Sequence, residues 1–204
     1  MPVQTRRPPQ NERLRQDILE AARELFIHEG YESVSMRRLA EKIEYSPTTI
    51  YLYFKDKSDL LQCLTEETFG RMLQRQEQLR ATHADPQELL RHLVRAYIEF
   101  GLENPTDYRI TFLMPAKMWA RPEDHLRPGS NAFKAFDGLR QAVAECMRQK
   151  RLRKLDLQLA SQILWSGAHG LTSLQILFPS FPWHEREKLI GETVETLLRG
   201  LAAD

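Results

Sequence analysis

The first strong pattern along the chain is a row of apolar residues between Asn11 and Gly30. They recur every three or four positions, which places them on one face of a helix: Leu14, Ile18, Ala21, Ala22, Leu25 and Phe26. Gly30 suits the end of this helix, because glycine tolerates the left-handed conformation there. Residues 1–10 contain three prolines and almost nothing to bury, so we expect a flexible basic arm.

Two short helices are predicted next. Ser33 or Ser35 can cap the first of them, whose apolar face is Met36, Leu39, Ala40 and Ile43. Ser46 followed by Pro47 is a strong start signal for the second, since a hydroxyl acceptor precedes a residue with a preset φ and no N–H to satisfy. We expect that helix to run to about Phe54.

The rest of the chain also has helical periodicity. Asp56 or Ser58 can cap a helix that extends toward Leu79, and the pairs Asp85-Pro86 and Asn104-Pro105 start two more, the second of which Pro115 ends. After a loop over residues 121–131, further helices are expected over residues 133–147, 156–177 and 183–201. No alternating strand pattern and no internal repeat occurs, so the predicted fold is all-α.

Composition narrows the class of protein. The chain has 204 residues, of which 42% are hydrophobic and 28% charged, as in a globular protein with a substantial core. No apolar run approaches the roughly 18 residues of a membrane span, and no signal peptide is visible, so we expect a cytoplasmic protein. Cys63 and Cys146 form no CxxC pair, so we expect neither a zinc site nor a disulfide framework, and no other cofactor.

Overall charge does not favour a nucleic-acid partner, because the formal net charge is only +1. A case for DNA binding must therefore rest on where the charges lie. Two short helices joined by a tight turn behind a longer helix form a helix-turn-helix, whose second short helix can enter the major groove. At 100° per residue, Ile50 and Phe54 face the core, whereas the outward residues are Thr48, Thr49, Tyr51 and Leu52.

The outward side chains suit a DNA duplex. Threonine and tyrosine hydroxyls can bind base edges or phosphates, and threonine or leucine methyl groups can contact a thymine methyl. None of them can bind guanine through two hydrogen bonds, but Arg37 and Arg38 can supply that contact or a phosphate clamp. Lys55 and Lys57 lie at the start of the next helix, where backbone phosphates are expected to pass.

The segments Ser35-Met36-Arg37-Arg38-Leu39-Ala40 and Tyr45 to Lys57 resemble the signature of the TetR family of transcription regulators, over about residues 11–70. The family usually has glycine where this chain has Glu44, so we expect an unusual backbone conformation there. The resemblance implies an N-terminal helix-turn-helix domain over residues 11–57 and a C-terminal helical bundle for ligand binding and dimerisation over residues 58–204. It also implies that DNA-contacting positions are Arg37, Pro47, Thr48, Thr49, Tyr51, Tyr53 and Lys57.

The C-terminal part has a weaker resemblance. The run from Ile163 to Gly170 resembles the Trp…His-Gly helix of one TetR subgroup. In that family the last two helices of each subunit pair to form a homodimer, for which the apolar candidates are Leu171, Leu174, Ile176, Val194, Leu197, Leu198 and Leu201. A dimer suits a palindromic double-stranded operator, because two recognition helices about 34–36 Å apart read two half-sites.

Two groups of residues are candidates for an effector pocket. Four of them cluster around Pro115, and the other two share a helix face at four-residue spacing: Phe112, Met114, Met118 and Trp119, then Trp165 and His169. Core packing is the alternative interpretation of all six, because apolar residues at helical spacing usually form core.

The function that these patterns favour is a ligand-responsive repressor that releases operator DNA when an effector binds. A regulator without an effector and an activator are the alternatives. An enzyme is disfavoured because no HExxH, P-loop, GxGxxG or GxSxG motif occurs. RNA is a poor fit, since the major groove of A-form RNA is too narrow for a helix.

Overall fold

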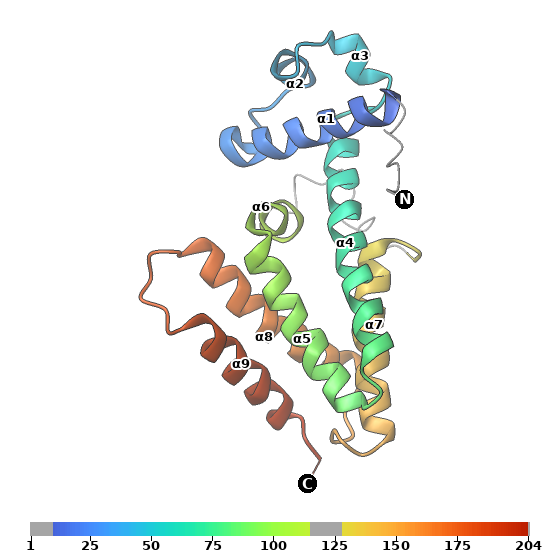
Figure 1. Ribbon diagram of the computed structural model, residues 1–204, viewed down its shortest axis with the longest axis vertical. Coiled ribbons are helices and arrows are strands. Elements are labelled where there is room, and N and C mark those ends of the chain that lie inside the picture. The colour runs from blue at the N-terminus through green and yellow to red at the C-terminus, as the bar shows by residue number, and fades with distance from the viewer. Residues whose placement is uncertain (1–9, 115–127, 204) are drawn as a thin grey trace, which may run out of the picture. The chain divides into compact units, whose positions relative to one another are not determined.

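The computed structural model describes residues 10–114 and 128–203, and the described part is helical, without a strand (Figure 1). The predicted all-α class is confirmed. The predicted basic arm lies almost wholly outside the described residues, as do Pro115 and most of the loop expected at residues 121–131. The helices are α1 (Gln10–Leu25), η1 (Phe26–Gly30), α2 (Met36–Lys42), α3 (Pro47–Tyr51), α4 (Lys57–Thr82), α5 (Pro86–Glu103), α6 (Pro105–Tyr108), η2 (Arg109–Leu113), α7 (Asn131–Arg148), α8 (Leu157–Leu177) and α9 (Arg186–Gly200).

The chain divides into two compact units. Unit 1 comprises Met1–Thr65 and Arg109–Pro122, and unit 2 comprises Glu66–Tyr108 and Glu123–Asp204. The first boundary falls within α4, beyond the position expected at Lys57, and the second falls between α6 and η2. Unit 1 therefore contains a segment that the sequence-based division placed wholly in the C-terminal domain.

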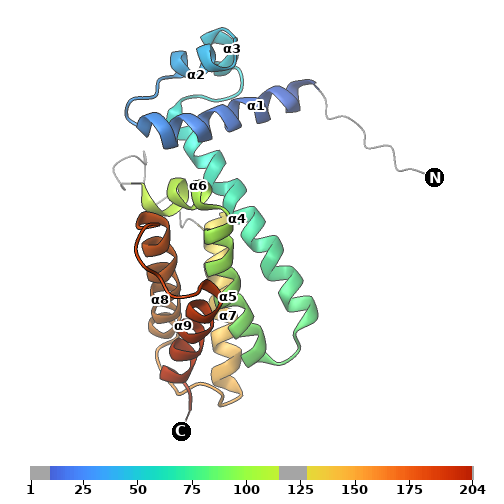
Figure 2. The ribbon, with the colours of Figure 1, turned by 60° about the vertical axis from the view of Figure 1, so that its left-hand side comes forward.

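Unit 1 is built on α1, with α2 and α3 lying together on one side of it (Figures 1 and 2). The apolar row predicted for α1 faces the core of the unit, and the helix ends in the π-helical turn η1. The core gathers buried side chains from all of its helices, including Ile18, Ala22, Phe26, Leu39, Ile50, Phe54, Leu61 and Ile110. Gly30 adopts φ +81°, as expected for a helix end.

The turn between α2 and α3 has a defined geometry. Glu44 adopts φ 60°, the left-handed conformation predicted from the absence of glycine there. The Tyr45 N–H donates to the Ala40 carbonyl at 3.0 Å and the Glu44 N–H to the Glu41 carbonyl at 3.3 Å, which is the Schellman pattern of helix ends. Two residues later, the Ser46 hydroxyl accepts from the Thr49 N–H at 3.1 Å and caps α3.

The predicted start signals are confirmed at several helices. Side-chain caps are formed by Ser35 at α2, Ser46 at α3, Asp85 at α5 and Asp156 at α8. Helix α9 differs, because it begins at Arg186 rather than near Trp183, and its N-cap Glu185 makes no side-chain cap bond. Helix α3 is also shorter than expected, since the N–H groups of Leu52 and Tyr53 bond three residues back and tighten the chain into a turn.

Unit 2 is organised around α5, which packs against α7, α8 and α9 (Figure 2). Its core is formed by buried residues from these helices, including Leu90, Val94, Ile98, Val143, Cys146, Leu164, Ala168 and Ile190. Burial raises the pKa of the Cys146 thiol to about 11, which keeps it protonated at neutral pH.

The predicted dimer residues need correction. Four of the seven are buried within the protomer, at relative exposures of 6% or less: Ile176, Val194, Leu198 and Leu201. Three of these four, on α9 and directly after it, belong to the core that packs around α5, so they are not available to a partner subunit. Leu171 and Leu197 are half-buried against the same core, and only Leu174 is exposed, at 47%.

Candidate nucleic-acid interface

Helix α3 presents a row of side chains to solvent. Its inner side is fixed by Ile50, which is fully buried, and by Phe54, which follows the helix and is 1% exposed. On the outer side, Tyr51 is 55% exposed and Leu52 is 79% exposed, and Thr48 is also exposed. The predicted orientation of α3 is therefore confirmed for these residues. Pro47, at the first position of the helix, is exposed as well.

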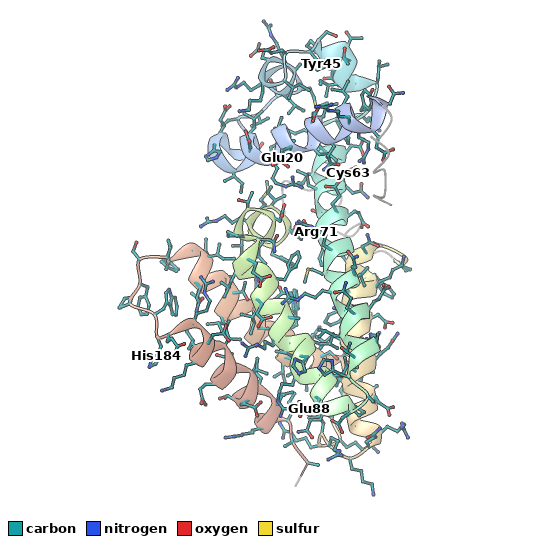
Figure 3. The ribbon with its side chains drawn as sticks, in the orientation of Figure 1. Glu20, Tyr45, Cys63, Arg71, Glu88 and His184 are labelled. Atoms are coloured by element: carbon teal, nitrogen blue, oxygen red, sulfur yellow. The ribbon has the colours of Figure 1, made fainter. Side chains whose placement is uncertain are left out.

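Thr49 differs from Thr48, although the sequence grouped them together. Its hydroxyl lies 2.9 Å from the Ser46 hydroxyl, and its side chain is half-buried. The Thr49 side chain therefore contributes to the cap of α3, whereas Thr48 faces outward. Tyr45, in the turn before α3, is a further exposed aromatic side chain, at 48% (Figure 3). Sequence analysis missed it, because only the turn geometry shows that it points away from the core.

The two neighbouring arginines at the start of α2 have different environments. Arg37 is 82% exposed and makes one bond of 3.2 Å from Nε to Glu41. Arg38 donates to both carboxylate oxygens of Glu29, the shortest of these bonds being 2.7 Å. This pairing lowers the pKa of Glu29 and raises that of Arg38. Arg37 is thus the arginine with its guanidinium extended into solvent, and Arg38 connects α2 to η1.

The two lysines near the start of α4 also differ. Lys55 is exposed. The Lys57 ammonium donates to the backbone carbonyl of Tyr31 at 2.6 Å and to that of Glu32 at 3.4 Å. It also lies 4.3 Å from the centroid of the Tyr31 ring, within cation–π range. Lys57 therefore joins the start of α4 to the loop between η1 and α2.

Tyr53 has one side in the core and its hydroxyl at the surface. The ring is half-buried against the core of unit 1, and the hydroxyl donates to Asn11 Oδ1 over 3.3 Å. Asn11 is on α1, so this bond ties the first turn of α1 to the segment after α3. A hydroxyl in this position can still accept a hydrogen bond from another group.

A second polar site lies inside unit 2, where a hydrogen-bonded aromatic cluster joins α5, α6 and α8. The Trp165 indole N–H donates to the Tyr97 hydroxyl at 3.1 Å, and the Tyr97 and Tyr108 hydroxyls are 3.0 Å apart. His169 Nδ1 lies 2.5 Å from the Tyr108 hydroxyl and 3.1 Å from that of Tyr97. The four-residue spacing in the sequence predicts Trp165 and His169 as candidates but not the tyrosines, whose helical periodicity is that of ordinary core residues.

Burial sets the protonation of this aromatic cluster. It raises the pKa of Tyr97 to about 12 and that of Tyr108 further, and it lowers the pKa of His169. The imidazole is therefore neutral at neutral pH, and its Nδ1 shares hydrogen bonds with the two tyrosine hydroxyls. Gly101 allows the close packing, because a Cβ there would lie 2.7 Å from the Tyr108 ring and 2.4 Å from Thr172 Cγ2.

The six residues predicted for an effector pocket do not all lie in one unit. Trp165 and His169 belong to unit 2, where their rings lie 5.8 Å apart. Phe112 and Met114 belong to the segment assigned to unit 1, and Met114 packs against the core of that unit. Met118 and Trp119 lie outside the described residues.

The described residues contain no group of three or more His, Cys, Asp or Glu side chains that could hold a metal ion. No helix in the described ranges is long and apolar enough to cross a membrane.

A short, capped second helix with an exposed outer face, packed on a longer helix, defines a helix-turn-helix protein. Residues 18–64 match the family model described as bacterial regulatory proteins of the tetR family, and residues 90–201 match the tetracyclin repressor-like C-terminal domain. The chain belongs to the tetR family.

Individual relatives agree with this assignment. An HTH-type transcriptional regulator of Staphylococcus aureus is 30% identical over 92 residues, which are 45% of this chain and 50% of the relative. The chain thus spans about half the length of the curated relatives it matches. The crystal structure of the TetR family regulator PfmR from Thermus thermophilus is 26% identical, with a TM-score of 0.71, covering 93% of this chain and 98% of PfmR. The fatty acid degradation regulator FadR from Bacillus halodurans shares the fold, at 19% identity and a TM-score of 0.71, covering 93% and 97% of the two chains.

The contacts of Lys57 generate a prediction about stability. Replacing Lys57 with alanine leaves two carbonyl groups without their donor, so we expect unit 1 to lose about 1 kcal/mol of stability. Lys55→Ala is the matched control, because an exposed lysine without such contacts changes stability by no more than about 0.5 kcal/mol. Native-state hydrogen exchange of the α1–α3 amides measures both. Equal protection in Lys57→Ala and the wild type would contradict the structural role.

Proposed function

We propose that this protein is a sequence-specific transcription regulator that binds a palindromic operator as a homodimer and releases it when a small molecule binds unit 2. The observation that carries the proposal is the orientation of α3, whose inner side is locked by Ile50 and whose outer side presents Thr48, Tyr51 and Leu52. An exposed helix face of this kind fits the major groove of duplex DNA.

The chemistry of the exposed side chains suits different contacts with DNA, some to base edges and others to the phosphate backbone. Thr48 and Tyr51 hydroxyls can reach base edges and phosphate oxygens, and Pro47 and Tyr53 flank them. The exposed Arg37 guanidinium can bind guanine O6 and N7 through two hydrogen bonds. Lys55 offers a charge for the DNA backbone. The side chains of three further predicted residues already make contacts within the protein: Arg38, Thr49 and Lys57. They support DNA binding by holding the helices of unit 1 in place as well as by direct contact.

The surface of α8 supports homodimer formation. Four apolar side chains remain exposed along one side of it in two pairs, Leu159 with Ile163 and Leu174 with Leu177, which about three helical turns separate. Gly170 lies in the same row, and a Cβ there would meet nothing within 4 Å. Such a row, open at its middle, allows a second helix to approach closely. We infer that two protomers pair through α8, with α9 beside it, and thereby set two recognition helices on one duplex.

The aromatic cluster supports control by a small molecule. Trp165 is 38% exposed and donates to the half-buried Tyr97, whose hydroxyl contacts the fully buried Tyr108, so the cluster connects the surface of unit 2 to its interior. Tyr108 is the last residue of unit 2 before the chain enters η2, which belongs to unit 1. A ligand that competes for these hydrogen bonds would therefore act at the point where the two units are covalently joined. Repression, relieved by the ligand, is the simplest sign of control.

DNA binding is tested by footprinting the purified protein on the DNA that flanks its own gene. We expect protected half-sites about one helical turn apart. Arg37→Ala is expected to weaken binding by about 1–3 kcal/mol, because a two-bond contact to guanine is lost. Arg38→Ala, one residue along, is the comparison and should lose less affinity, because the Arg38 guanidinium is engaged by Glu29. Tyr51→Ala should also bind less tightly while remaining folded. Absence of any protected site, or unchanged affinity in a folded Tyr51→Ala dimer, would count against the proposal.

Homodimer formation is tested by analytical ultracentrifugation of Leu174→Glu. A carboxylate within the exposed apolar row would be buried without a partner in a dimer, so we expect the variant to sediment as a monomer. Gln158→Glu places the same charge on another side of α8, where it should leave the dimer intact. Circular dichroism checks that both variants fold. A Leu174→Glu protein that remains dimeric would show that the interface lies elsewhere.

Effector binding is tested by a thermal-shift screen of small molecules against the wild type and two tryptophan variants. A ligand at 100 times its Kd stabilises the folded state by about 2.7 kcal/mol, which raises the melting temperature. Trp165→Phe removes the N–H that bonds to Tyr97, so it should lose the shift, and it should also lose ligand-induced release of DNA. Trp183→Phe is the control, since its N–H bonds to the Phe178 carbonyl instead. A chain that binds its operator and responds to no ligand would be a constitutive regulator.

A further inference from the structure

Leu52 is unusually exposed for an apolar side chain. Its relative exposure is 79%, whereas Phe181, the next most exposed large apolar residue in the described part of the chain, reaches 57%. Leu52 directly follows α3, and its φ of −72° and ψ of −22° continue the helical path. Because helical residues four apart share a face, Leu52 lies one turn beyond Thr48 on the outer side of α3.

The rest of this face contains no group that binds a base through two hydrogen bonds. Residues 46–54 read Ser-Pro-Thr-Thr-Ile-Tyr-Leu-Tyr-Phe, without arginine, lysine, asparagine or glutamine. Tyr51 has a hydroxyl that can reach phosphate, and Thr48 offers a hydroxyl and a methyl group. The side chain that projects furthest into solvent is therefore one that cannot form a hydrogen bond.

The major groove of DNA offers one apolar group on the base edges, which is the 5-methyl group of thymine. Phosphates and the other base edges are polar, and contact with them would remove water without replacing its hydrogen bonds. Leu52 is continuous with the DNA-contacting face proposed above, so its partner is expected to lie in the same groove. We infer that Leu52, together with the Thr48 methyl group, recognises thymine through its 5-methyl group. The operator half-site then carries thymine opposite α3.

This inference rests on the proposed function, and the experiment separates the two. The full-length wild-type protein is used to select duplexes from a random library, and the enriched duplex is resynthesised with deoxyuridine in place of each half-site thymine. Deoxyuridine keeps base pairing and the O4 acceptor but lacks the methyl group. Deoxyuridine outside the protected region controls for general effects on the duplex. Affinities are measured at one fixed salt concentration, because DNA binding depends strongly on salt.

We expect the wild type to lose about fourfold in affinity for each contacted methyl group that is removed. Leu52→Ala should bind the thymine duplex more weakly and should distinguish the deoxyuridine duplex from it less than the wild type does at one position of each half-site. Leu52→Met is the conservative control, because it keeps an apolar side chain and should keep the preference for thymine. An exposed position tolerates both changes without loss of folding.

Equal affinity of the wild type for the thymine and deoxyuridine duplexes would overturn the inference while leaving sequence-specific binding intact. A Leu52→Ala protein with the full thymine preference would also overturn it, as would one whose affinities are unchanged, because Leu52 would then serve another partner. If no duplex is enriched by the folded, dimeric wild type, both the inference and the proposed function fail.

Discussion

The burial of Ile50 and Phe54 behind α3 is the constraint on which the proposed interface depends. A rotation of this short helix by one residue would expose Ile50 and bury a polar group, so the apolar contacts fix which side faces out. The turn before it adds a second constraint. Glu44 adopts a left-handed conformation, which costs a non-glycine residue about 1 kcal/mol or more. The hydrogen bonds of the Schellman motif offset this cost and end α2 directly before Ser46 caps α3.

Capping signals made most of the secondary structure predictable from sequence. Two dipeptides predict a helix start from local sequence alone, because a capping acceptor directly precedes a proline with a preset φ: Ser46-Pro47 and Asp85-Pro86. Both helices begin there. The π-helical turns η1 and η2 were missed, since they depend on packing at a helix end and have no local signature. The start of α9 was also predicted wrongly. Its N-cap residue, Glu185, makes no side-chain cap bond, so no capping signal marks this start in the sequence.

Periodicity could not tell which apolar row of a helix stays exposed. Helix α9 has one apolar row, which packs into the core around α5, so Val194 and Leu198 are buried. Helix α8 has two rows, of which one, with Leu164, is buried while the other, with Leu174, remains on the surface. The same limit applies to charge. Arg37 and Arg38 are neighbours in sequence, and only the position of Glu29, on another element, shows which guanidinium is engaged.

The proposed control of DNA binding from unit 2 requires a physical path, and two of the covalent connections between the units lie within the described residues: α4 and the segment from α6 to η2. Within unit 2 these two segments are joined by a hydrogen bond, because Arg71 of α4, which Figure 3 labels, donates to Asp107 of α6 at 2.5 Å. Arg75, one turn along α4, pairs with Glu99 of α5, and Glu99 in turn pairs with Arg95 of the same helix.

Tyr108 follows Asp107 directly and is held by His169 of α8. A shift of α8 therefore acts on α6 through a hydrogen bond, and on α4 through the ion pair next to it. Because Arg71 and Asp107 form an ion pair, the two segments cannot move independently without separating the buried Asp107 carboxylate from its partner. A change at one place in unit 2 thus affects both of these connections to unit 1. The proposed two-state control by a single ligand requires such a coupling.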